Sequence, residues 1–217
     1  MFTAIEGPAG KIEALLDEPI LPARAAVVFA HPHPLYGGTM HTKVVYAGAK
    51  ALERIGCAVL RFNFRGVGTS AGTFDEGRGE LNDFRVALDF MAERYPGLEL
   101  WTAGFSFGAW ISLTAGATDG RVRVLLAIAP PVRYDVSAVV TSEKPKFFIH
   151  GERDEISPLK EMQSFYARLP EPKELVVIDA ADHLFDGKVS EVADAIEDLL
   201  EDFQASSSSR TLLKEES

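Results

Sequence analysis

Short apolar runs recur along the chain and alternate with segments that carry apolar residues at helical spacing. Each run is rich in Val, Ile, Leu or Phe and lacks regular alternation with polar residues. Runs of this kind are typical of parallel strands that are buried on both faces. We therefore predict six such strands, at Ala25–Ala30, Cys57–Phe62, Leu98–Ala103, Val122–Ala129, Lys146–Ile149 and Glu174–Ile178.

The segments between these runs place their apolar side chains on one face, as helices that pack against a sheet do. Such stretches lie at Val44–Ile55, Leu81–Met91, Ala109–Ala117, Met162–Leu169 and Val189–Phe203. Near the start of the chain, Phe2–Glu6 and Lys11–Leu16 flank two glycines and predict an antiparallel hairpin. This order predicts a three-layer α/β fold, in which a mostly parallel sheet with an antiparallel N-terminal hairpin carries helices on both faces.

The chain has 217 residues, 47% of them apolar, which suits one domain with a buried core. We assign residues 1–204 to this domain. The Ser-rich residues 205–217 predict a polar, flexible C-terminal tail. Exposed leucines of the last helix, Leu199 and Leu200, together with Leu212-Leu213 of the tail, suggest a homodimer, although packing of this helix on the sheet explains most of its apolar residues.

The charge balance argues against two classes of partner. The chain has 22 Lys and Arg against 32 Asp and Glu, a net charge of -10, and such a surface repels nucleic-acid phosphates and anionic lipids. The first residues do not resemble a signal peptide, and no apolar run approaches the roughly 20 residues that cross a bilayer. A single cysteine, Cys57, opens an apolar run and is expected to be buried. We therefore expect a cytoplasmic protein with no nucleic-acid or membrane partner.

The pentapeptide Gly104-Phe105-Ser106-Phe107-Gly108 carries the strongest chemical signal. It follows the predicted strand Leu98–Ala103 directly and precedes a predicted helix, which is the setting in which a sharp turn exposes a nucleophilic serine. Glycines on both sides fit, because side chains there would collide with neighbouring elements. Ser106 is therefore the candidate nucleophile, and the alternative is a glycine-rich strand exit with an incidental serine.

A serine hydroxyl is a poor nucleophile without a general base. On this kind of strand–turn–helix the acid and then the histidine follow the serine along the chain. Of the five histidines, only His150 and His183 follow Ser106. His183 is the candidate base, because it lies in the loop after the last strand, whereas His150 closes a strand. Asp154 follows the preceding strand and is the candidate acid, with Asp135 as the alternative.

Acyl transfer also needs two N–H donors for the oxyanion. One candidate is the amide of Phe107, directly after the nucleophile. The other is the amide of His33 in the loop His31-Pro32-His33-Pro34, because proline has no N–H. Three apolar side chains near these groups are expected to line the substrate site: Leu35, Tyr36 and Phe105.

Two further patterns suggest a cofactor site or a metal site, but the sequence around each pattern argues against it. Gly66–Ala71 matches the G-x-G-x-x-A pattern of dinucleotide binding, but more glycines intervene before the next helix. A pyrophosphate there would lack the helix N-terminus that binds it. His31 and His33 are separated by a rigid proline and have no carboxylate nearby in the sequence, so they are weak evidence for a metal site. We expect neither a cofactor nor a metal.

Together these motifs resemble the α/β-hydrolase superfamily over roughly residues 1–203. The motifs are Gly104–Gly108, Asn63–Ser70, His150–Asp154 and Asp182-His183. The loop His31–Pro34, with Gly37-Gly38 after it, looks like that of a compact bacterial subgroup of predicted hydrolases. Dienelactone hydrolases are similar more distantly and use a cysteine where this chain has Ser106. The resemblance implies the fold and a Ser-Asp-His triad, and it does not specify the substrate.

Many hydrolases of this superfamily carry a lid domain before the strand that leads to the acid. Here only Pro130–Lys144 is available, which predicts one short helix at most and an open, shallow site. Residues and resemblance together predict a serine hydrolase that cleaves small-molecule carboxylic esters through an acyl-serine intermediate. Thioester or peptide cleavage on the same triad, and a non-catalytic binding protein with this fold, stay open as alternatives.

Overall fold

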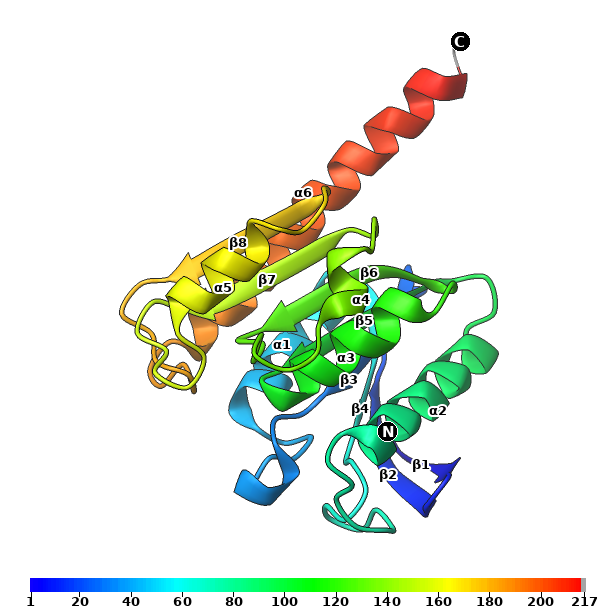
Figure 1. Cartoon of the computed structure of the whole chain (residues 1–217). Coiled ribbons are helices and arrows are strands. Elements are labelled where there is room, and N and C mark those ends of the chain that lie inside the picture. Colours follow the sequence, from blue (N-terminus) through cyan, green and yellow to red (C-terminus); the bar gives the residue numbers. More distant parts are fainter. Residues whose placement is uncertain (216–217) are drawn as a thin grey trace.

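The computed structural model describes residues 1–215, with side chains for residues 1, 3–201 and 203, and is built on one eight-stranded sheet (Figure 1). The strand order is β1-β2-β4-β3-β5-β6-β7-β8. All neighbours from β4 to β8 are parallel, whereas β1 pairs with β2, and β2 with β4, in antiparallel fashion. The strands are β1 Phe2–Gly7, β2 Gly10–Asp17, β3 Ala25–Ala30, β4 Cys57–Phe62, β5 Glu99–Phe105, β6 Val122–Ile128, β7 Lys146–Gly151 and β8 Lys173–Ile178.

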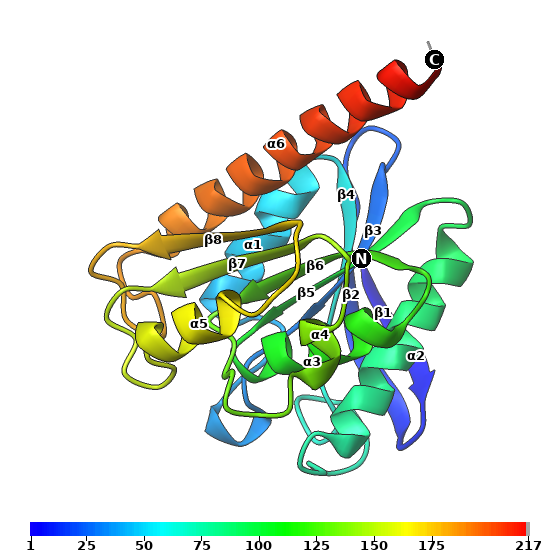
Figure 2. The same ribbon diagram turned by 45° about the horizontal axis from the view of Figure 1, so that its top comes forward.

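Helices cover both faces of this sheet, as Figures 1 and 2 show. The helices are α1 Lys43–Arg54, α2 Arg78–Arg94, α3 Phe107–Thr118, α4 Ser137–Val140, α5 Leu159–Tyr166 and α6 Val189–Glu215, with a 3-10 turn, η1, at Pro34–Tyr36. Side chains of the strands alternate between two cores: Val27 and Phe29 of β3 pack with α1 and α6, and Val28 packs with the other helices. The predicted three-layer α/β fold is confirmed.

Two details of the fold differ from the sequence prediction. We expected β8 to be buried on both faces, but it is an edge strand with β7 on one side only, and its central residues Leu175 and Val176 are only partly buried. We also expected Leu199 and Leu200 of α6 to be exposed, but both are buried, because this side of α6 packs on the sheet and on α1. The side chains of Leu212 and Leu213 lie outside the described residues.

The β6–β7 connection and the C-terminal helix α6 bear on the predictions of a minimal lid and of a flexible tail. Only α4, four residues long, lies in the β6–β7 connection, so the expected minimal lid is confirmed. Helix α6 continues to Glu215, so residues 205–215 are helical in secondary structure where we expected a tail. The flexibility of that tail stays a prediction, and residues 216 and 217 lie outside the described part. In that part no helix is both long and apolar enough to cross a bilayer.

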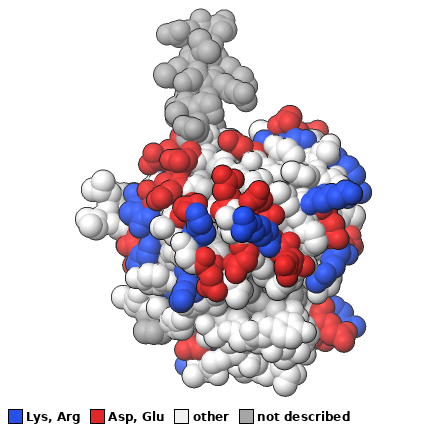
Figure 3. Space-filling model, turned by 90° about the vertical axis from the view of Figure 1, so that its left-hand side faces the viewer, with Lys and Arg blue, Asp and Glu red and all other residues white. Residues whose placement is uncertain are grey.

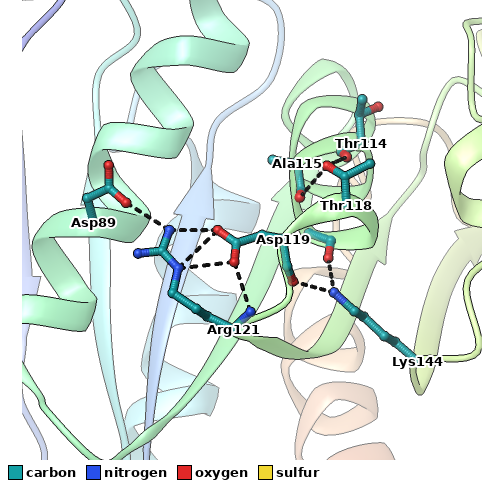
Figure 4. A network of polar contacts seen from close by, with 8 residues as sticks. Asp89, Thr114, Ala115, Thr118, Asp119, Arg121 and Lys144 are labelled. Carbon is teal, nitrogen blue, oxygen red and sulfur yellow. Dashed lines mark hydrogen bonds and ion pairs between the residues drawn. The ribbon is translucent and has the colours of Figure 1, made fainter.

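The end of α3 farthest from the serine is held by a polar network (Figure 4). The Arg121 guanidinium binds the carboxylates of Asp119 and Asp89 at 2.6 and 2.7 Å. Lys144 Nζ donates to the carbonyls of Gly116 and Asp119, which lie at the C-terminal end of α3. A cation at a helix C-terminus satisfies carbonyls that have no intrahelical partner and favours the helix dipole. This network ties α3 to the start of β6 and to α2.

The loop after β3 is held in place by the buried side chain of His31. Its Nδ1–H donates to the Pro32 carbonyl at 2.6 Å, and its Nε2 accepts from the Phe64 N–H at 3.0 Å. Both contacts need the neutral imidazole, because a protonated Nε2 would face an N–H. Burial lowers the pKa of His31 from 6.5 to about 4. His31 therefore joins the loops after β3 and β4 as a neutral side chain.

This contact predicts a pH-dependent stability. Because the pKa of His31 is about 4 in the fold and near 6.5 in the unfolded chain, the unfolded chain takes up a proton first as the pH falls. The stabilisation is present above pH 6.5 and is lost as the pH falls through 4, with a total on the order of 3 kcal/mol. We expect urea unfolding at pH 7 and pH 4.5 to show a smaller pH dependence for His31→Gln than for the wild type. The exposed His41 provides the control, His41→Gln, and equal pH dependence in all three proteins would contradict this assignment.

Candidate active site

Ser106 lies on the sharp turn between β5 and α3. Its backbone has φ 55° and ψ -120°. Residues other than glycine adopt such a positive φ only at a cost of about 1–3 kcal/mol. The Ser106 N–H donates to the Ile128 carbonyl at the end of β6, at 2.8 Å. The strained turn is thus fixed by the neighbouring strand, and the Ser106 side chain is left only partly buried.

The glycines on both sides of this turn are required by close packing, as the sequence predicts. A Cβ added at Gly104 would lie 2.2 Å from the Gly108 carbonyl oxygen. A Cβ added at Gly108 would lie 2.5 Å from the Ala30 carbonyl oxygen and 2.4 Å from that of His31. These distances are far below contact distance, so the start of α3 packs directly on the backbone at the end of β3.

The structure brings Ser106, His183 and Asp154 together in one line of hydrogen bonds. The Ser106 hydroxyl lies 2.8 Å from His183 Nε2, and His183 Nδ1 lies 2.7 Å from Asp154 Oδ2. Because a carboxylate accepts, His183 donates through Nδ1 and leaves Nε2 to accept from the serine. His183 is 7% exposed and Asp154 4%, so little water competes for these bonds.

Asp154 is oriented by the turn that follows it. Its Oδ1 accepts from the N–H groups of Ile156 and Ser157, at 2.9 and 2.7 Å, which leaves Oδ2 for His183. The alternative acid, Asp135, does not reach His183. Its carboxylate is exposed and accepts from the Ser137 N–H at 3.0 Å. The structure therefore pairs His183 with Asp154.

A residue that we interpreted only as a strand end, His150, supports this carboxylate. It is fully buried, its Nε2–H donates to the Ser157 carbonyl at 2.7 Å, and the same Nε2 lies 3.7 Å from Asp154 Oδ2. Burial lowers the pKa of His150, which favours the neutral side chain beside the carboxylate. The sequence signal for this role was the four-residue spacing of His150 and Asp154 across a strand end.

The loop that carries His183 is shaped by its own side chains. Asp182 Oδ1 accepts from the N–H groups of Leu184 and Asp186, at 3.0 and 3.1 Å, and these bonds fold the loop back on the Asp182 side chain. The His183 ring lies 5.6 Å from the ring of Phe105, and the two ring planes are tilted by 31°. The imidazole is thus held between its hydrogen bonds and an aromatic face.

His33 and Phe107, whose amides are predicted to bind an oxyanion, line one pocket together with Ser106. Among the described residues, neither amide donates to another protein group. The His33 ring is turned back on its own loop, where Nδ1 accepts from the Leu35 N–H at 3.2 Å, and burial lowers its pKa. The loop closes tightly, since a Cβ on Gly38 would lie 2.1 Å from the Pro32 carbonyl oxygen.

The pocket over Ser106 has a volume of about 580 Å³ and is mostly apolar. Of the predicted wall residues, Tyr36 and Phe105 line it. Leu35 does not, which corrects the prediction for this residue. Successive side chains of a 3-10 turn point about 120° apart, and in η1 Tyr36 faces the pocket while Leu35, 67% exposed, points elsewhere.

The glycine-rich segment Gly66–Ala71 is a structural turn. Gly68 has φ 58°, and a Cβ there would lie 2.3 Å from the Glu13 carboxylate. That carboxylate accepts from the Thr69 N–H and from the Asn63 side chain, at 3.0 and 2.8 Å. Helix α2 begins only at Arg78, so the turn lacks the helix start of a dinucleotide site.

Histidine, cysteine and carboxylate side chains do not gather into a cation site in the part of the chain that the structure describes. No group of three or more of them is arranged to hold a metal ion there. Both ring nitrogens of His31 are used on backbone groups, as is Nδ1 of His33. These loop histidines therefore serve the shape of the loop.

Comparison with known proteins places this geometry in a family. A family model described as serine aminopeptidase, S33, matches residues 22–144. An uncharacterized protein of Rickettsia prowazekii is 38% identical over 204 residues, 89% of this chain and 86% of that protein. The structure of an alpha-beta serine hydrolase homologue from Coxiella burnetii is 37% identical, covers 91% of this chain and 95% of its own, and has a TM-score of 0.86.

A serine hydrolase without a lid from Xanthomonas campestris is 35% identical, with a TM-score of 0.87 and 94% of each chain covered. The matched family segment includes the loop after β3, the serine turn and nearly all of the short β6–β7 connection, and it ends before Asp154 and His183. The chain therefore belongs to the serine hydrolases of the α/β-hydrolase superfamily, in the family described as serine aminopeptidase, S33, and among its compact members without a lid.

Proposed function

We propose that this protein is an esterase that hydrolyses small carboxylic esters through an acyl-serine intermediate on Ser106. The observation that carries the proposal is the unbroken line of hydrogen bonds from Ser106 through His183 to the buried carboxylate of Asp154. A serine, a base within hydrogen-bond distance and a group that orients the base together make an activated nucleophile. The family membership supports the same reaction class.

In the acylation step, Ser106 Oγ attacks the ester carbonyl carbon while its proton moves to His183 Nε2. The N–H groups of His33 and Phe107 receive the negative charge that develops on the carbonyl oxygen. The N-terminus of α3, where Phe107 lies, adds a favourable field for this charge. Asp154 stabilises the imidazolium that forms, and His183 then gives its proton to the leaving alcohol oxygen as the C–O bond breaks.

In the deacylation step, a water molecule takes the place of the alcohol. His183 accepts a proton from this water, whose oxygen attacks the acyl carbon, and the same two amides receive the charge again. The bond to Ser106 Oγ breaks, and the proton on His183 returns to the serine. The absence of a lid in the described β6–β7 connection favours this step, since water reaches the acyl group without a conformational change.

The first prediction of this proposal concerns the nucleophile. A fluorophosphonate probe should label the wild type on Ser106, and Ser106→Ala should lose both the labelling and ester hydrolysis. Mass spectrometry of the labelled peptide identifies the modified residue. Ser164, exposed on α5, gives the control Ser164→Ala, which should label like the wild type. Labelling that persists in Ser106→Ala would contradict the proposal.

The second prediction separates the two candidate acids. Asp154→Asn keeps the shape of the side chain but removes its charge and favours the wrong tautomer of His183, so kcat should fall on the order of 10³–10⁴-fold. Asp135→Asn should stay close to the wild type, because that carboxylate contacts Ser137 and not His183. Steady-state hydrolysis of p-nitrophenyl acetate measures both variants. The reverse ranking would assign the acid to Asp135.

The third prediction concerns the substrate class. The family name raises peptide cleavage as a second candidate, and thioester cleavage uses the same groups. We expect p-nitrophenyl esters of two to six carbons to be hydrolysed fastest, because the short β6–β7 connection adds no wall that would surround a longer acyl chain. Amino-acid p-nitroanilides and short acyl thioesters are measured beside them. Faster turnover of anilides would make the protein a peptidase, and no turnover of any substrate would favour a non-catalytic binding protein.

A further inference from the structure

The pocket over Ser106 is almost free of charged side chains. Among the described residues that line it, Arg133 is the only Asp, Glu, Lys or Arg. Elsewhere the surface is rich in charge, with acidic and basic side chains interspersed over the upper and middle part of the face in Figure 3 and a net charge of -10 for the chain. A lone cation in an otherwise apolar pocket of an acidic protein is therefore unusual for this molecule.

The guanidinium of Arg133 has little to bind within the protein. Its one hydrogen bond, from Nη1 to the Ile156 carbonyl, is long at 3.3 Å, and no carboxylate of the described residues lies within ion-pair distance. Arg133 is exposed, whereas Arg61 and Arg65, which are less exposed, each bind an aspartate at 2.7 Å. A guanidinium carries five N–H donors, so most of those on Arg133 are free to bind a ligand.

The strand order places Arg133 on one flank of Ser106 and the oxyanion amide of His33 on the other. Strand β5, which ends at Ser106, lies between β3 and β6. The loop after β3 carries His33, and the loop after β6 carries Arg133. A substrate whose carbonyl oxygen lies at the His33 and Phe107 amides therefore has another part within reach of the Arg133 side of the pocket.

The side chains around Arg133 indicate what that part of the substrate looks like. Tyr134 lies beside it, with its ring 4.8 Å from that of Trp110, and Ile156 carries the carbonyl that Arg133 binds. Tyr134 and Ile156 are 40% and 50% exposed, although both are apolar and line the pocket. Exposed apolar side chains gathered at a pocket mouth favour contact with an apolar ligand chain.

The geometry points to Arg133 as a subsite for a carboxylate, so that the substrate is an ester with an apolar acyl chain that ends in a free carboxylate, a half-ester of a dicarboxylic acid. This inference rests on the proposed ester hydrolysis and adds the class of its substrate. A single planar guanidinium matches a planar carboxylate of one charge, which it binds through two parallel hydrogen bonds. A phosphate dianion would leave charge uncompensated at a site with one cation.

The test compares two esters of equal acyl length, p-nitrophenyl hexanoate and the mono-p-nitrophenyl ester of adipic acid. We expect the wild type to show a higher kcat/KM for the adipate half-ester, and Arg133→Gln to lower that value about tenfold more than the value for hexanoate, mainly through KM. Arg133→Lys keeps the charge and should retain part of the preference. High salt should weaken the preference in the wild type, because the charge pair is accessible to solvent.

Arg168→Gln is the matched control, since Arg168 lines the neighbouring hollow with Arg133 but not the pocket over Ser106. The ratio of the kcat/KM values for the two esters should be unchanged in this control variant. Equal losses for both esters in Arg133→Gln would overturn the subsite and leave Arg133 as a support for the Ile156 loop.

A binding measurement separates this inference from the proposed reaction. Calorimetric titration of Ser106→Ala with the two esters should show tighter binding of the half-ester, and the double variant Ser106→Ala, Arg133→Gln should lose the difference. If the wild type hydrolyses neither ester, the esterase proposal fails, and this titration still decides on the carboxylate subsite. Equal binding of both esters would overturn the subsite even in an active esterase.

Discussion

The left-handed backbone of Ser106 is the constraint on which the site depends. The turn is tight enough that α3 starts against the end of β3, and the approach of Gly108 to the Ala30 carbonyl leaves no room for a side chain. The same approach carries the loop after β3 to the N-terminus of α3. His33 and Phe107 belong to segments far apart in the chain, and this packing brings them to one pocket. The strain at the serine and the meeting of these two segments therefore share one cause.

A second set of contacts maintains the acid and the base. The carboxylate of Asp154 is buried and has two oxygens with different partners, backbone N–H groups for Oδ1 and His183 for Oδ2. His150 fixes the turn that supplies those N–H groups by donating to the Ser157 carbonyl. A positive charge on His150 would lie 3.7 Å from Oδ2 and compete with the charge that the proposed reaction places on His183. The lowered pKa of His150 therefore suits a neighbour of the acid, because a neutral ring leaves Asp154 to His183.

Sequence reasoning predicted the strands well because a strand buried on two faces has a simple signature, an unbroken apolar run. It also predicted which residues would meet, since parallel strands end at one edge of the sheet and Ser106, Asp154 and His183 each follow a strand. It was less successful where the outcome depends on loop direction. Leu35 and Tyr36 are neighbours in the sequence, but the twist of η1 sends only one of them to the pocket.

The contact of His150 with Ser157 was missed for the same reason, because it depends on the path of the turn between these two residues. Apolarity alone also did not show that β8 forms the edge of the sheet.

The short β6–β7 connection determines how this site can select among substrates. A lid surrounds a substrate with new walls when it closes, but α4 has four residues and cannot do so. Selection must then come from side chains already present on the loops after β3, β5, β6, β7 and β8, which together line the pocket. Apolar contact with such open walls distinguishes ligands weakly, because each methylene contributes only about 0.8 kcal/mol even when fully buried. Polar groups at fixed positions discriminate more strongly, since an unmatched charge or donor loses its partner. In a pocket with one charged side chain, that side chain is where specificity is expected to arise.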